Sequence, residues 1–464
     1  MKKFWILFIF SALSLVACRK DDTTDNGETD LYYGNLFCAS IMRSYYLWNE
    51  EMAEKINAWS SRTDPAKQVE NCRYELDEWT CFYNNISTFQ MAVDGVMQSM
   101  GFEFVVKYLN EEKTEIGAVV TFTYEGTSAR EAGLKRGDVI VAIDGQKLML
   151  TNYSNLLNRK IYQSNFIEVE LQDGRNVTLD SKKMYLNPVH TVRTLDVEGK
   201  KIGYLHYTSF TQESCKELEK VFRQFREDGI SELVLDLRYN GGGYAAVSTA
   251  LASMIAPAEK VNGNSPFVKS IFNSVYTEYL EEHGTSMSTP FTPHPSILGE
   301  EIDAIGVNPG IQKLWVITGS MTASAAEELI CGLEPYMDVT LVGRTTSGKF
   351  CGGNIITAAD WYQSVGEGDN ASKINWRSGL RLCANNGIYV MISRYTDCNG
   401  VTLSMPDGID PDIPVSDDPL EAIPLGDPNE RMLAAVLAQT KAPGSTPADD
   451  ELPFEKPGFG LLIY

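Results

Sequence analysis

Three short segments of this 464-residue chain contain residues that could do covalent chemistry, and the first surrounds Ser324. In Thr322-Ala323-Ser324-Ala325-Ala326-Glu327 a serine lies between alanines, shortly after an apolar run that predicts a strand. At a strand-to-helix junction the serine hydroxyl would be sterically accessible and close to the unpaired N–H groups of a helix N-terminus. The spacing of Ser324 and Glu327 also fits a capping box, which needs no catalysis. Taken alone, the segment favours the cap, although the two roles can coexist.

The second segment, residues 343–350, has the spacing Gly-x4-Gly-Lys of a phosphate-binding loop. That loop needs Ser or Thr after the lysine to hold Mg²⁺, whereas here the next residue is Phe350. A nucleotide site is therefore disfavoured. The third segment is the glycine run 241–243, which follows a predicted buried strand. Its backbone N–H groups could point at an anion, or the run could be only a flexible connection between a strand and a helix.

Ser324 and Lys349 together would supply a nucleophile and its base. A serine hydroxyl is a poor nucleophile near neutral pH and needs an adjacent base. A lysine can accept the proton if burial lowers its pKa, because a desolvated ammonium group is costly. Ser–Lys pairs are a recognised variant of the catalytic triad. Neither a metal nor a cofactor is expected, because the four histidines do not cluster in the sequence and no Cys-x-x-Cys occurs.

The order of these motifs resembles peptidase family S41, the C-terminal-processing peptidases. The chain has Leu-Asp-Leu-Arg238-x-Asn240 before the glycine run, then the serine segment, then Gly348-Lys349, and residues 407–415 match the closing segment of that domain. With the N-terminal and PDZ-like parts described below, the resemblance covers about residues 31–440. It implies a protease domain with a crotonase/ClpP-like core.

The resemblance also implies a role for each residue of the site. Ser324 would attack the scissile carbonyl to form an acyl-enzyme, and Lys349 would take its proton. The oxyanion would be held by the N–H of Ala325 and by that of a glycine in the run, for which Gly242 is the expected donor and Gly241 the second choice.

One departure concerns the group that orients Lys349. Many members of the family carry a glutamine four residues after the lysine, whereas here that position is Gly353. The partner of Lys349 is therefore unassigned, with Asn354 a weak candidate. Cys351, two residues from the base, is a second oddity, and in an oxidising compartment it could pair with another cysteine such as Cys331.

The elements that must position these residues divide into several parts. The sequence predicts a multidomain α+β protein with a signal peptide (1–17), a lipidated N-terminus and tether (18–30), an N-terminal helical domain (31–98), a PDZ-like β domain (99–186), an α/β S41 protease domain (187–440), and a linker with an apolar C-terminal tail (441–464). Residues 257–312, rich in Ser, Pro, Gly and Asn, are predicted to form a long excursion over the surface.

The PDZ-like part rests on residues 129–145, whose pattern predicts a one-turn helix, a tight turn, a buried strand and a hairpin. Met100, Gly101, Phe102 and Phe104 lie where PDZ domains keep their carboxylate-binding loop. PDZ domains bind peptides by adding a strand at the sheet edge, so this part is expected to capture apolar C-terminal tails. The alternative is a purely structural spacer.

The two ends of the chain carry their own signals. Residues 1–17 have a basic start and an apolar stretch too short to span a membrane, and Cys18 follows as in a bacterial lipobox. We expect lipidation of Cys18 and an outer-membrane lipoprotein, on either the periplasmic or the cell-surface side. Residues 461–464 are apolar and resemble the tails this family takes. They could occupy the PDZ groove or be trimmed, but packing on the protease domain is favoured.

Composition excludes some partners and leaves other questions open. The net charge of −22 argues against nucleic acid, since no basic stripe could neutralise phosphates. Apart from Cys18, eight cysteines remain, and their spacing selects no pairing. The sequence thus predicts a serine endopeptidase that cleaves extracytoplasmic proteins near apolar C-terminal tails. The alternative is a catalytically inactive, membrane-tethered peptide-binding protein.

Overall fold

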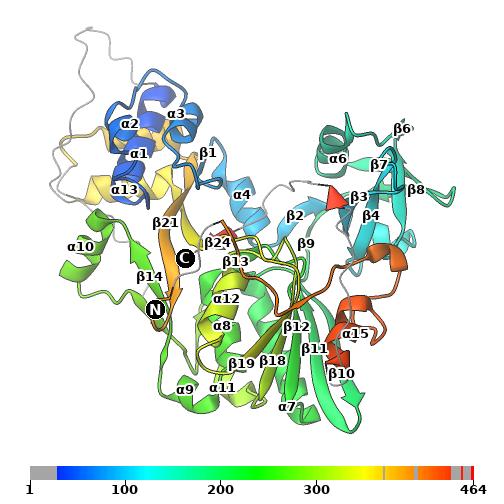
Figure 1. Ribbon diagram of the computed structural model, residues 1–464. Coiled ribbons are helices and arrows are strands. Elements are labelled where there is room, and N and C mark those ends of the chain that lie inside the picture. The colour runs from blue at the N-terminus through cyan, green and yellow to red at the C-terminus, as the bar shows by residue number, and fades with distance from the viewer. Residues whose placement is uncertain (1–28, 369–370, 402–405, 440–450, 453–460, 464) are drawn as a thin grey trace.

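The computed structural model describes residues 29–368, 371–401, 406–439, 451–452 and 461–463. In Figure 1 a helical lobe and a β-rich lobe stand above a larger α/β body. The predicted signal peptide, Cys18 and most of the tether lie outside the described residues. Within the described ranges, no helix has both the length and the apolar character needed to cross a membrane.

The α/β body is built on a mostly parallel sheet with strand order β10-β11-β12-β18-β19-β22. Its strands are β10 (Val189–Val197), β11 (Lys200–Tyr207), β12 (Glu232–Asp236), β18 (Lys313–Thr318), β19 (Asp338–Gly343) and β22 (Ile413–Pro414). Only β10 is antiparallel among these strands. Parallel strands that are covered on both faces need apolar side chains on both faces, which explains the continuous apolar runs of β12 and β18.

Helices cover the two faces of this sheet, and each face has its own core. One face packs against α15 (Arg431–Ala438), whose Met432, Leu433 and Val436 contact strand residues such as Val234 and Ile317. The other face packs against α7 (Cys215–Asp228), α8 (Ala245–Ile255) and α12 (Ala325–Leu333) within the largest core. The end of β18 and the start of α12 frame Ser324, so this packing fixes the serine in space.

A second, mixed sheet lies above the first, with strand order β13-β24-β20-β21-β14-β15. Its strands are β13 (Gly242–Tyr244), β24 (Leu461–Ile463), β20 (Cys351–Thr357), β21 (Gly387–Asp397), β14 (Pro266–Phe272) and β15 (Ser288–Pro290). Both the glycine run and the residues after Lys349 therefore contribute strands to one sheet.

The prediction that residues 257–312 form a surface excursion is wrong. The segment contains α9 (Ala258–Asn262), β14, α10 (Ser274–Glu282), β15, β16 (Ser296–Ile297), β17 (Glu300–Glu301) and α11 (Ala304–Val307). Phe267 and Val268 of β14 are fully buried, and β14 pairs with β21. The alternation of apolar and polar residues in β14 is short, and the polar and turn-forming residues around it made the strand hard to recognise. Its partner strand β21 also lies more than a hundred residues away in the sequence.

The N-terminal helices share the core of the body. They are α1 (Asp30–Ser44), α2 (Ala53–Asn57), α3 (Pro65–Asn71) and α4 (Ile86–Val93), and they are joined by α13 (Ala358–Glu367) and α14 (Trp376–Cys383). The Tyr362 hydroxyl donates to the Tyr33 carbonyl at 2.7 Å. In a segment expected to be helical, β1 (Cys81–Tyr83) pairs with β21. This lobe is therefore attached to the second sheet by backbone pairing as well as by helix packing.

The β-rich lobe is a twisted sheet with a separate hydrophobic core. It comprises β3 (Phe102–Tyr108), β4 (Ile116–Thr123), α5 (Ser128–Glu131), β5 (Val139–Ile143), β6 (Gln146–Lys147), α6 (Tyr153–Ile161), β7 (Phe166–Leu171) and β8 (Asn176–Asp180). The hairpin after β5 turns at Asp144 and Gly145, which have φ of 48° and 71°, as an Asp-Gly turn requires. An antiparallel pair, β2 (Val96–Ser99) and β9 (Lys182–Tyr185), joins the lobe to the body.

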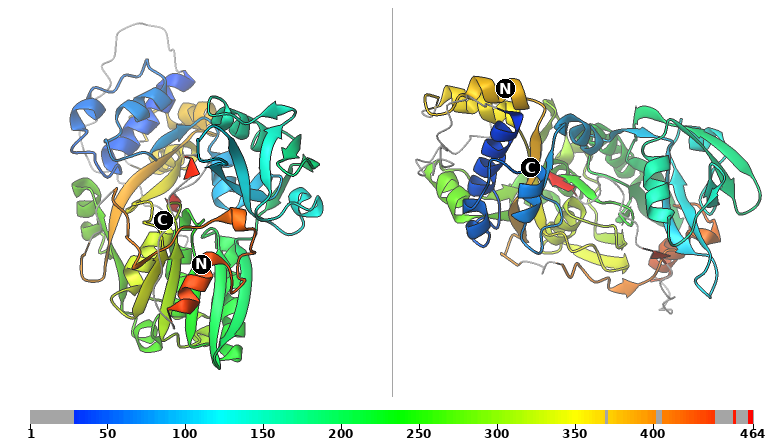
Figure 2. Two further views of the ribbon diagram at one scale, coloured as in Figure 1. Left: turned by 45° about the vertical axis from the view of Figure 1, so that its right-hand side comes forward. Right: turned by 90° about the horizontal axis from the view of Figure 1, so that it is seen from above.

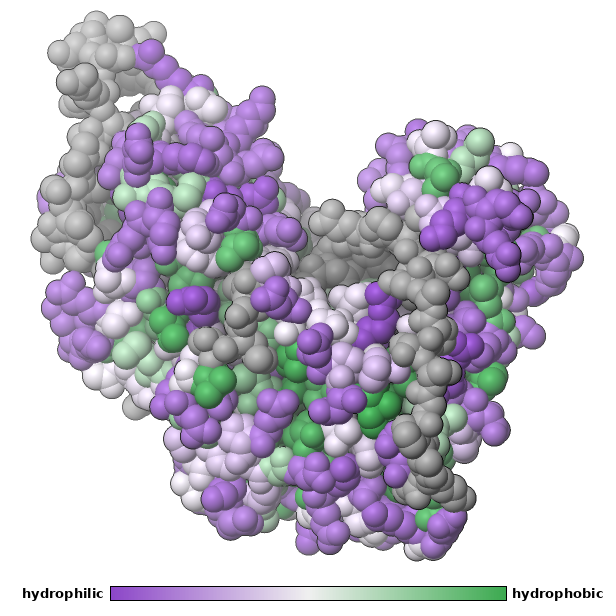
Figure 3. Space-filling view, viewed as in Figure 1, coloured by the Kyte–Doolittle hydropathy of each residue, from purple (hydrophilic) through white to green (hydrophobic). Residues whose placement is uncertain are grey.

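Two further views show how the parts are arranged. Figure 2 shows the helical lobe and the β-rich lobe side by side above the body, with β24 between them. In Figure 3 hydrophilic residues dominate the visible face, with small apolar areas among them. A hydrophilic surface of this kind agrees with the strongly acidic composition, since charge away from zero favours solubility.

Candidate active site

Ser324 lies between β18 and α12 in a strained backbone conformation. Its φ and ψ are 62° and −115°, a region that a non-glycine residue adopts only at a cost of about 1–3 kcal/mol. The side chain is fully buried, and Oγ has no hydrogen-bond partner among the described residues. Strain at a serine on a sharp strand-to-helix turn is typical of nucleophiles, because the turn separates Oγ from the backbone groups that would otherwise bind it.

Glu327 connects the serine segment to the lysine segment. Its carboxylate accepts from the backbone N–H groups of Ser324 at 2.7 Å, Gly348 at 2.7 Å and Lys349 at 3.0 Å. The Thr346 hydroxyl donates to the same carboxylate at 2.5 Å. The sequence identified Glu327 only as part of a capping box, whereas the structure gives it a second set of donors from a loop about 20 residues away.

Lys349 precedes β20 and is fully buried. Its Nζ lies 4.8 Å from the ring centroid of Trp79 and 5.5 Å from that of Tyr389. It is also 3.5 Å from the Tyr389 hydroxyl. Burial lowers the pKa of Lys349 to about 8, partly opposed by Cys351, Asp77 and Glu327 nearby. A substantial fraction of this amine is therefore neutral just above neutral pH, as a general base requires.

Gly353 occupies the position of the missing glutamine for a steric reason. A Cβ at this residue would lie 2.4 Å from Met391 Cε and 2.7 Å from the Tyr389 ring. The aromatic rings of Tyr389 and Trp79 fill the space beside the lysine instead. Gly353 faces Tyr389, and successive strand residues point to opposite faces. A role for Asn354, the weak candidate from the sequence, stays a prediction.

The glycine run is held close to the serine segment by Asn240. The Asn240 carbonyl accepts from the Ala323 N–H at 3.0 Å, and its Nδ2 donates to the Tyr207 carbonyl at 2.9 Å. Its Oδ1 accepts from the Gly242 N–H at 2.8 Å. The arrangement argues against Gly242 as the oxyanion donor, because its N–H is already bound within its own loop. Gly241 lies in the loop before β13.

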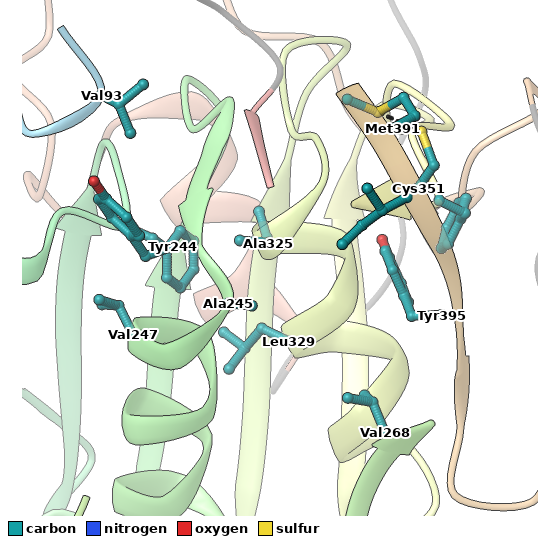
Figure 4. Packing of buried hydrophobic residues seen from close by; sticks show 14 of the residues in the cluster. Val93, Tyr244, Ala245, Val247, Val268, Ala325, Leu329, Cys351, Met391 and Tyr395 are labelled. Atoms are coloured by element: carbon teal, nitrogen blue, oxygen red, sulfur yellow. Dashed lines mark hydrogen bonds between the residues drawn. The ribbon is translucent and has the colours of Figure 1, made fainter. Parts of the chain in front are cut away.

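Ala325 is the first residue of α12, directly after Ser324. Its N–H belongs to the first helical turn, whose donors have no acceptor within the helix. Figure 4 shows Ala325 at the start of α12, with Tyr244 on one side and Cys351, Met391 and Tyr395 on the other. The Tyr395 hydroxyl donates to the Ser324 carbonyl at 3.1 Å. The serine segment is thus held from the side of β21 as well.

The strand that leads into the glycine run ends in a buried ion cluster. The Arg238 guanidinium donates to Asp236 Oδ2 at 2.8 Å and to Glu430 Oε1 at 2.7 Å. Asp417 accepts from Arg238 at 3.0 Å and also bonds Arg136, which lies in the turn before β5 of the β-rich lobe. The cluster therefore ties the β-rich lobe to the strand end that positions Asn240.

The predicted peptide-binding residues lie at the start of β3. Met100, Phe102 and Phe104 are all buried within the core of the β-rich lobe. Gly101 has φ of 89°, and a Cβ there would clash with Thr127. Its carbonyl accepts from the Tyr124 N–H at 2.9 Å. The three apolar side chains build the core in this structure, so their contact with a peptide stays a prediction.

The expectation that Cys351 pairs with another cysteine is not met. All eight cysteines of the described residues are free thiols. The buried Cys351 Sγ lies 3.4 Å from Met391 Sδ, whereas Cys331 belongs to α12. Cys351 therefore acts as a small apolar residue that packs against β21.

Comparisons with known proteins agree with this geometry. Residues 201–415 match the model of peptidase family S41, and residues 119–161 match that of a PDZ domain. The carboxyl-terminal-processing protease of Synechocystis is 27% identical over 274 residues, which are 58% of this chain and 56% of that protein. The carboxy-terminal processing protease CtpA of Bacillus subtilis is 25% identical over 57% of this chain and 50% of that protein. The chain spans about half the length of these curated relatives.

A solved structure supports the same assignment at the level of the fold. A Bacteroides fragilis protein described as an S41 protease has a TM-score of 0.66 with 22% identity. The match covers 87% of this chain and 96% of that one. The fold is thus a multidomain α+β architecture with a PDZ domain beside an α/β protease domain, as predicted. Residues 201–415 are thus similar to peptidase family S41, and the relatives matched are carboxyl-terminal-processing proteases.

Proposed function

We propose that the chain is a serine endopeptidase in which Ser324 is the nucleophile and Lys349 the general base. The observation that carries the proposal is the Glu327 carboxylate, which binds the backbone N–H groups of both residues. A strained serine and a buried lysine with a lowered pKa are thereby held in one site. The match of residues 201–415 to the model of peptidase family S41 supports the same reaction.

The chemistry follows from the environment of each group. The neutral amine of Lys349 takes the proton of the Ser324 hydroxyl as Oγ attacks the carbonyl carbon, and the resulting ammonium protonates the leaving amine. Trp79 and Tyr389 favour the transient ammonium form through their ring faces. The Ala325 N–H and a backbone N–H of the glycine run would bind the oxyanion, and one such donor is typically worth about 100- to 1000-fold in rate. Water then releases the acyl group.

The substrate class is proposed from the PDZ domain and from the relatives. PDZ domains bind an extended peptide at a sheet edge, and the relatives are named as carboxyl-terminal-processing proteases. We infer that the substrates are proteins with accessible, apolar C-terminal tails. The net charge of −22 disfavours acidic tails.

The test is cleavage of an unfolded protein that ends in an apolar tail, with fragments identified by mass spectrometry. Wild type should produce fragments, whereas Ser324→Ala and Lys349→Ala should produce none. An amidated or acidic tail on the same unfolded protein is the matched substrate control and should slow cleavage. Equal cleavage by wild type and Ser324→Ala would overturn the proposal.

A second candidate, a peptide-binding protein without turnover, is favoured by one observation. Ser324 Oγ has no hydrogen-bond partner among the described residues, so the dyad is not connected in this structure. This candidate predicts that wild type binds tail peptides but never cleaves them, and that Lys349→Ala binds them equally well. The cleavage experiment therefore separates the two functions.

We further propose that the protein acts outside the cytoplasm on a lipid anchor at Cys18. The support is the sequence of residues 1–18 alone. Incorporation of a labelled fatty acid by wild type but not by Cys18→Ser, in cells, tests this proposal. A wild-type protein that stays unlabelled would contradict it.

A further inference from the structure

The C-terminal segment contributes a strand to the sheet that contains the candidate active site. β24 (Leu461–Ile463) lies between β13 and β20 and is parallel to both. Gly243 is paired with Leu462, and Gly353 with Ile463. In Figure 4, β24 is the short red strand that lies beside β13 and above Ala325. Residues 461–463 therefore lie next to the strand of the glycine run.

The two neighbours of β24 are the strands that a substrate would have to contact. β13 contains two residues of the glycine run, and β20 begins two residues after Lys349. One edge of β13 is used by Phe210, whose N–H donates to the Gly242 carbonyl and whose carbonyl accepts from the Tyr244 N–H, both at 2.9 Å. Because backbone groups alternate along a strand, the groups of Gly243 face the other edge, where β24 lies.

Burial of the site agrees with this occupancy. Ser324 and Lys349 both have no exposed surface, so a polypeptide substrate cannot reach Oγ while the surroundings keep this arrangement. Without β24, the facing edges of β13 and β20 would lack a neighbour and leave a slot one strand wide. An extended peptide fits such a slot by the same backbone pairing that β24 makes.

The same segment contributes a second strand at the PDZ domain. β23 (Glu451–Leu452) pairs antiparallel with β3, with Glu451 opposite Lys107 and Leu452 opposite Val106. The other edge of β3 is taken by β4. β3 begins within the predicted carboxylate-binding loop, so β23 occupies the sheet edge at which a PDZ domain adds a peptide. Figure 1 shows β23 beside β3 and β24 beside β13.

We propose that residues 461–463 occupy the substrate groove between β13 and β20 and that β23 occupies the peptide-binding edge of the PDZ domain, so that the C-terminal segment is an intramolecular competitor of substrate. This inference rests on the proposed function and extends it. It identifies the groove as one that binds an extended apolar C-terminal strand parallel to β13. The apolar sequence Leu461-Leu462-Ile463-Tyr464 is of the class that the proposed function assigns to substrates.

A tethered competitor can act without high intrinsic affinity. A segment linked to its site has an effective concentration on the order of 1 mM. A strand with an intrinsic dissociation constant of about 0.1 mM would then weaken the binding of an external peptide about tenfold. Removal of the strand is therefore expected to strengthen the binding of an external peptide about tenfold.

The test measures binding in the Ser324→Ala background, so that it does not depend on cleavage. The probe is a fluorescent peptide with the sequence of residues 458–464. The chain that ends at residue 457 should bind this peptide about tenfold more tightly than the full chain. Leu462→Pro in the full chain should behave like the truncation, because proline cannot donate to the ladder. Leu462→Ala keeps the donor and is the matched control, with affinity near that of the full chain.

Equal affinity of the full chain, the truncated chain and Leu462→Pro would overturn the inference. Thermal unfolding of each variant excludes misfolding as a cause of lost binding, and Leu462→Pro gives an answer even if the truncated chain is unstable. With Ser324 intact, the truncation should lower KM for an unfolded protein about tenfold and leave kcat unchanged. If the truncated chain binds the peptide more tightly but no form cleaves protein, the proposed peptidase activity is contradicted and the competition by residues 461–463 is not. If the chain cleaves protein but truncation leaves peptide binding unchanged, the competition is contradicted and the peptidase activity is not.

Discussion

The backbone N–H of Ser324 donates to Oε2 of Glu327 at 2.7 Å, from within the first turn of the same helix. The same carboxylate binds Gly348, Lys349 and Thr346. Because these donors belong to two segments, the position of Ser324 relative to Lys349 depends on one buried side chain. Glu327 is in this sense a positioning residue for the proposed dyad.

Replacement of Glu327 should therefore lower both activity and stability. Glu327→Ala leaves several buried donors without an acceptor and should cost about 3 kcal/mol of unfolding free energy. Loss of alignment should reduce kcat by about 100-fold with little change in KM. Steady-state cleavage assays and denaturant unfolding measure the two effects.

The neighbouring Glu328 provides a matched control for that variant. It is equally buried, and burial raises its pKa to about 8, so that it is mainly protonated at neutral pH. Glu328→Gln copies the neutral form and should leave kcat within about twofold of wild type. A Glu327→Ala variant with wild-type activity would contradict the positioning role. A Glu328→Gln variant that loses as much activity as Glu327→Ala would also contradict it.

The pH dependence of cleavage should follow the titration of Lys349. The lowered pKa of about 8 means that the amine is charged, and cannot act as a base, at lower pH. Then kcat/KM should rise about tenfold per pH unit below pH 8 and become constant above it. Lys349→Arg cannot lose its proton and should be inactive at every pH. A flat profile between pH 6 and pH 9, or an active Lys349→Arg, would be incompatible with a lysine base.

The cluster of Arg136, Arg238 and Asp417 should make stability sensitive to acid. Although burial opposes ionisation, the two arginines hold the pKa of Asp417 at about 2. This folded-state pKa lies below the unfolded value, so the stabilisation is present above about pH 4 and is lost as pH falls toward 2. The difference in unfolding free energy between wild type and Asp417→Asn should be about 3 kcal/mol at pH 7 and should shrink across that range.

An exposed carboxylate serves as the control for this acid effect. Asp173 pairs with Arg175 at the surface, and exposed pairs contribute little. Asp173→Asn should unfold like wild type at all pH values. A constant difference between wild type and Asp417→Asn from pH 7 to pH 2 would show that the ion pair is not the source of the stability.

Gly353 should tolerate no side chain. A methyl group there would meet the Tyr389 ring, which lies beside Lys349. Overpacking of this kind typically costs about 1–3 kcal/mol, and displacement of Tyr389 should also reduce kcat. Gly353 is not among the glycines with a left-handed φ, so the cost of Gly353→Ala would come from packing and not from backbone strain. If Gly353→Ala were as stable and active as wild type, the steric account of the missing glutamine would be wrong.

The family resemblance and the fold class could be predicted from the sequence because both depend on patterns among neighbouring residues. The apolar runs of β12 and β18 and the Asp-Gly hairpin after β5 each predict their element from neighbouring residues. The order of the serine, lysine and glycine motifs then predicted the similarity to peptidase family S41 that residues 201–415 show. What failed was long-range pairing, as in β14 and β1, whose partner β21 is distant in the chain.

The candidate site was predicted in part. Ser324 and Lys349 were selected by their motifs, but Trp79 and Tyr389 come from segments with no catalytic signature and approach Lys349 only through the fold. Gly242 was chosen for its place in the glycine run, and the sequence could not show that Asn240 would bind its N–H. The spacing of Ser324 and Glu327 drew attention to Glu327, although it indicated only a helix cap and not the contacts with Gly348 and Lys349.

The central claim is that Ser324 becomes acylated. The most direct measurement is the intact mass of the protein after reaction with the p-nitrophenyl ester of a short apolar acyl group, followed by peptide mapping. The account predicts one added acyl group in wild type, located on Ser324, with a formation rate that increases with pH up to about 8 and no adduct in Ser324→Ala. An adduct on another residue, or equal labelling of wild type and Ser324→Ala, would contradict it.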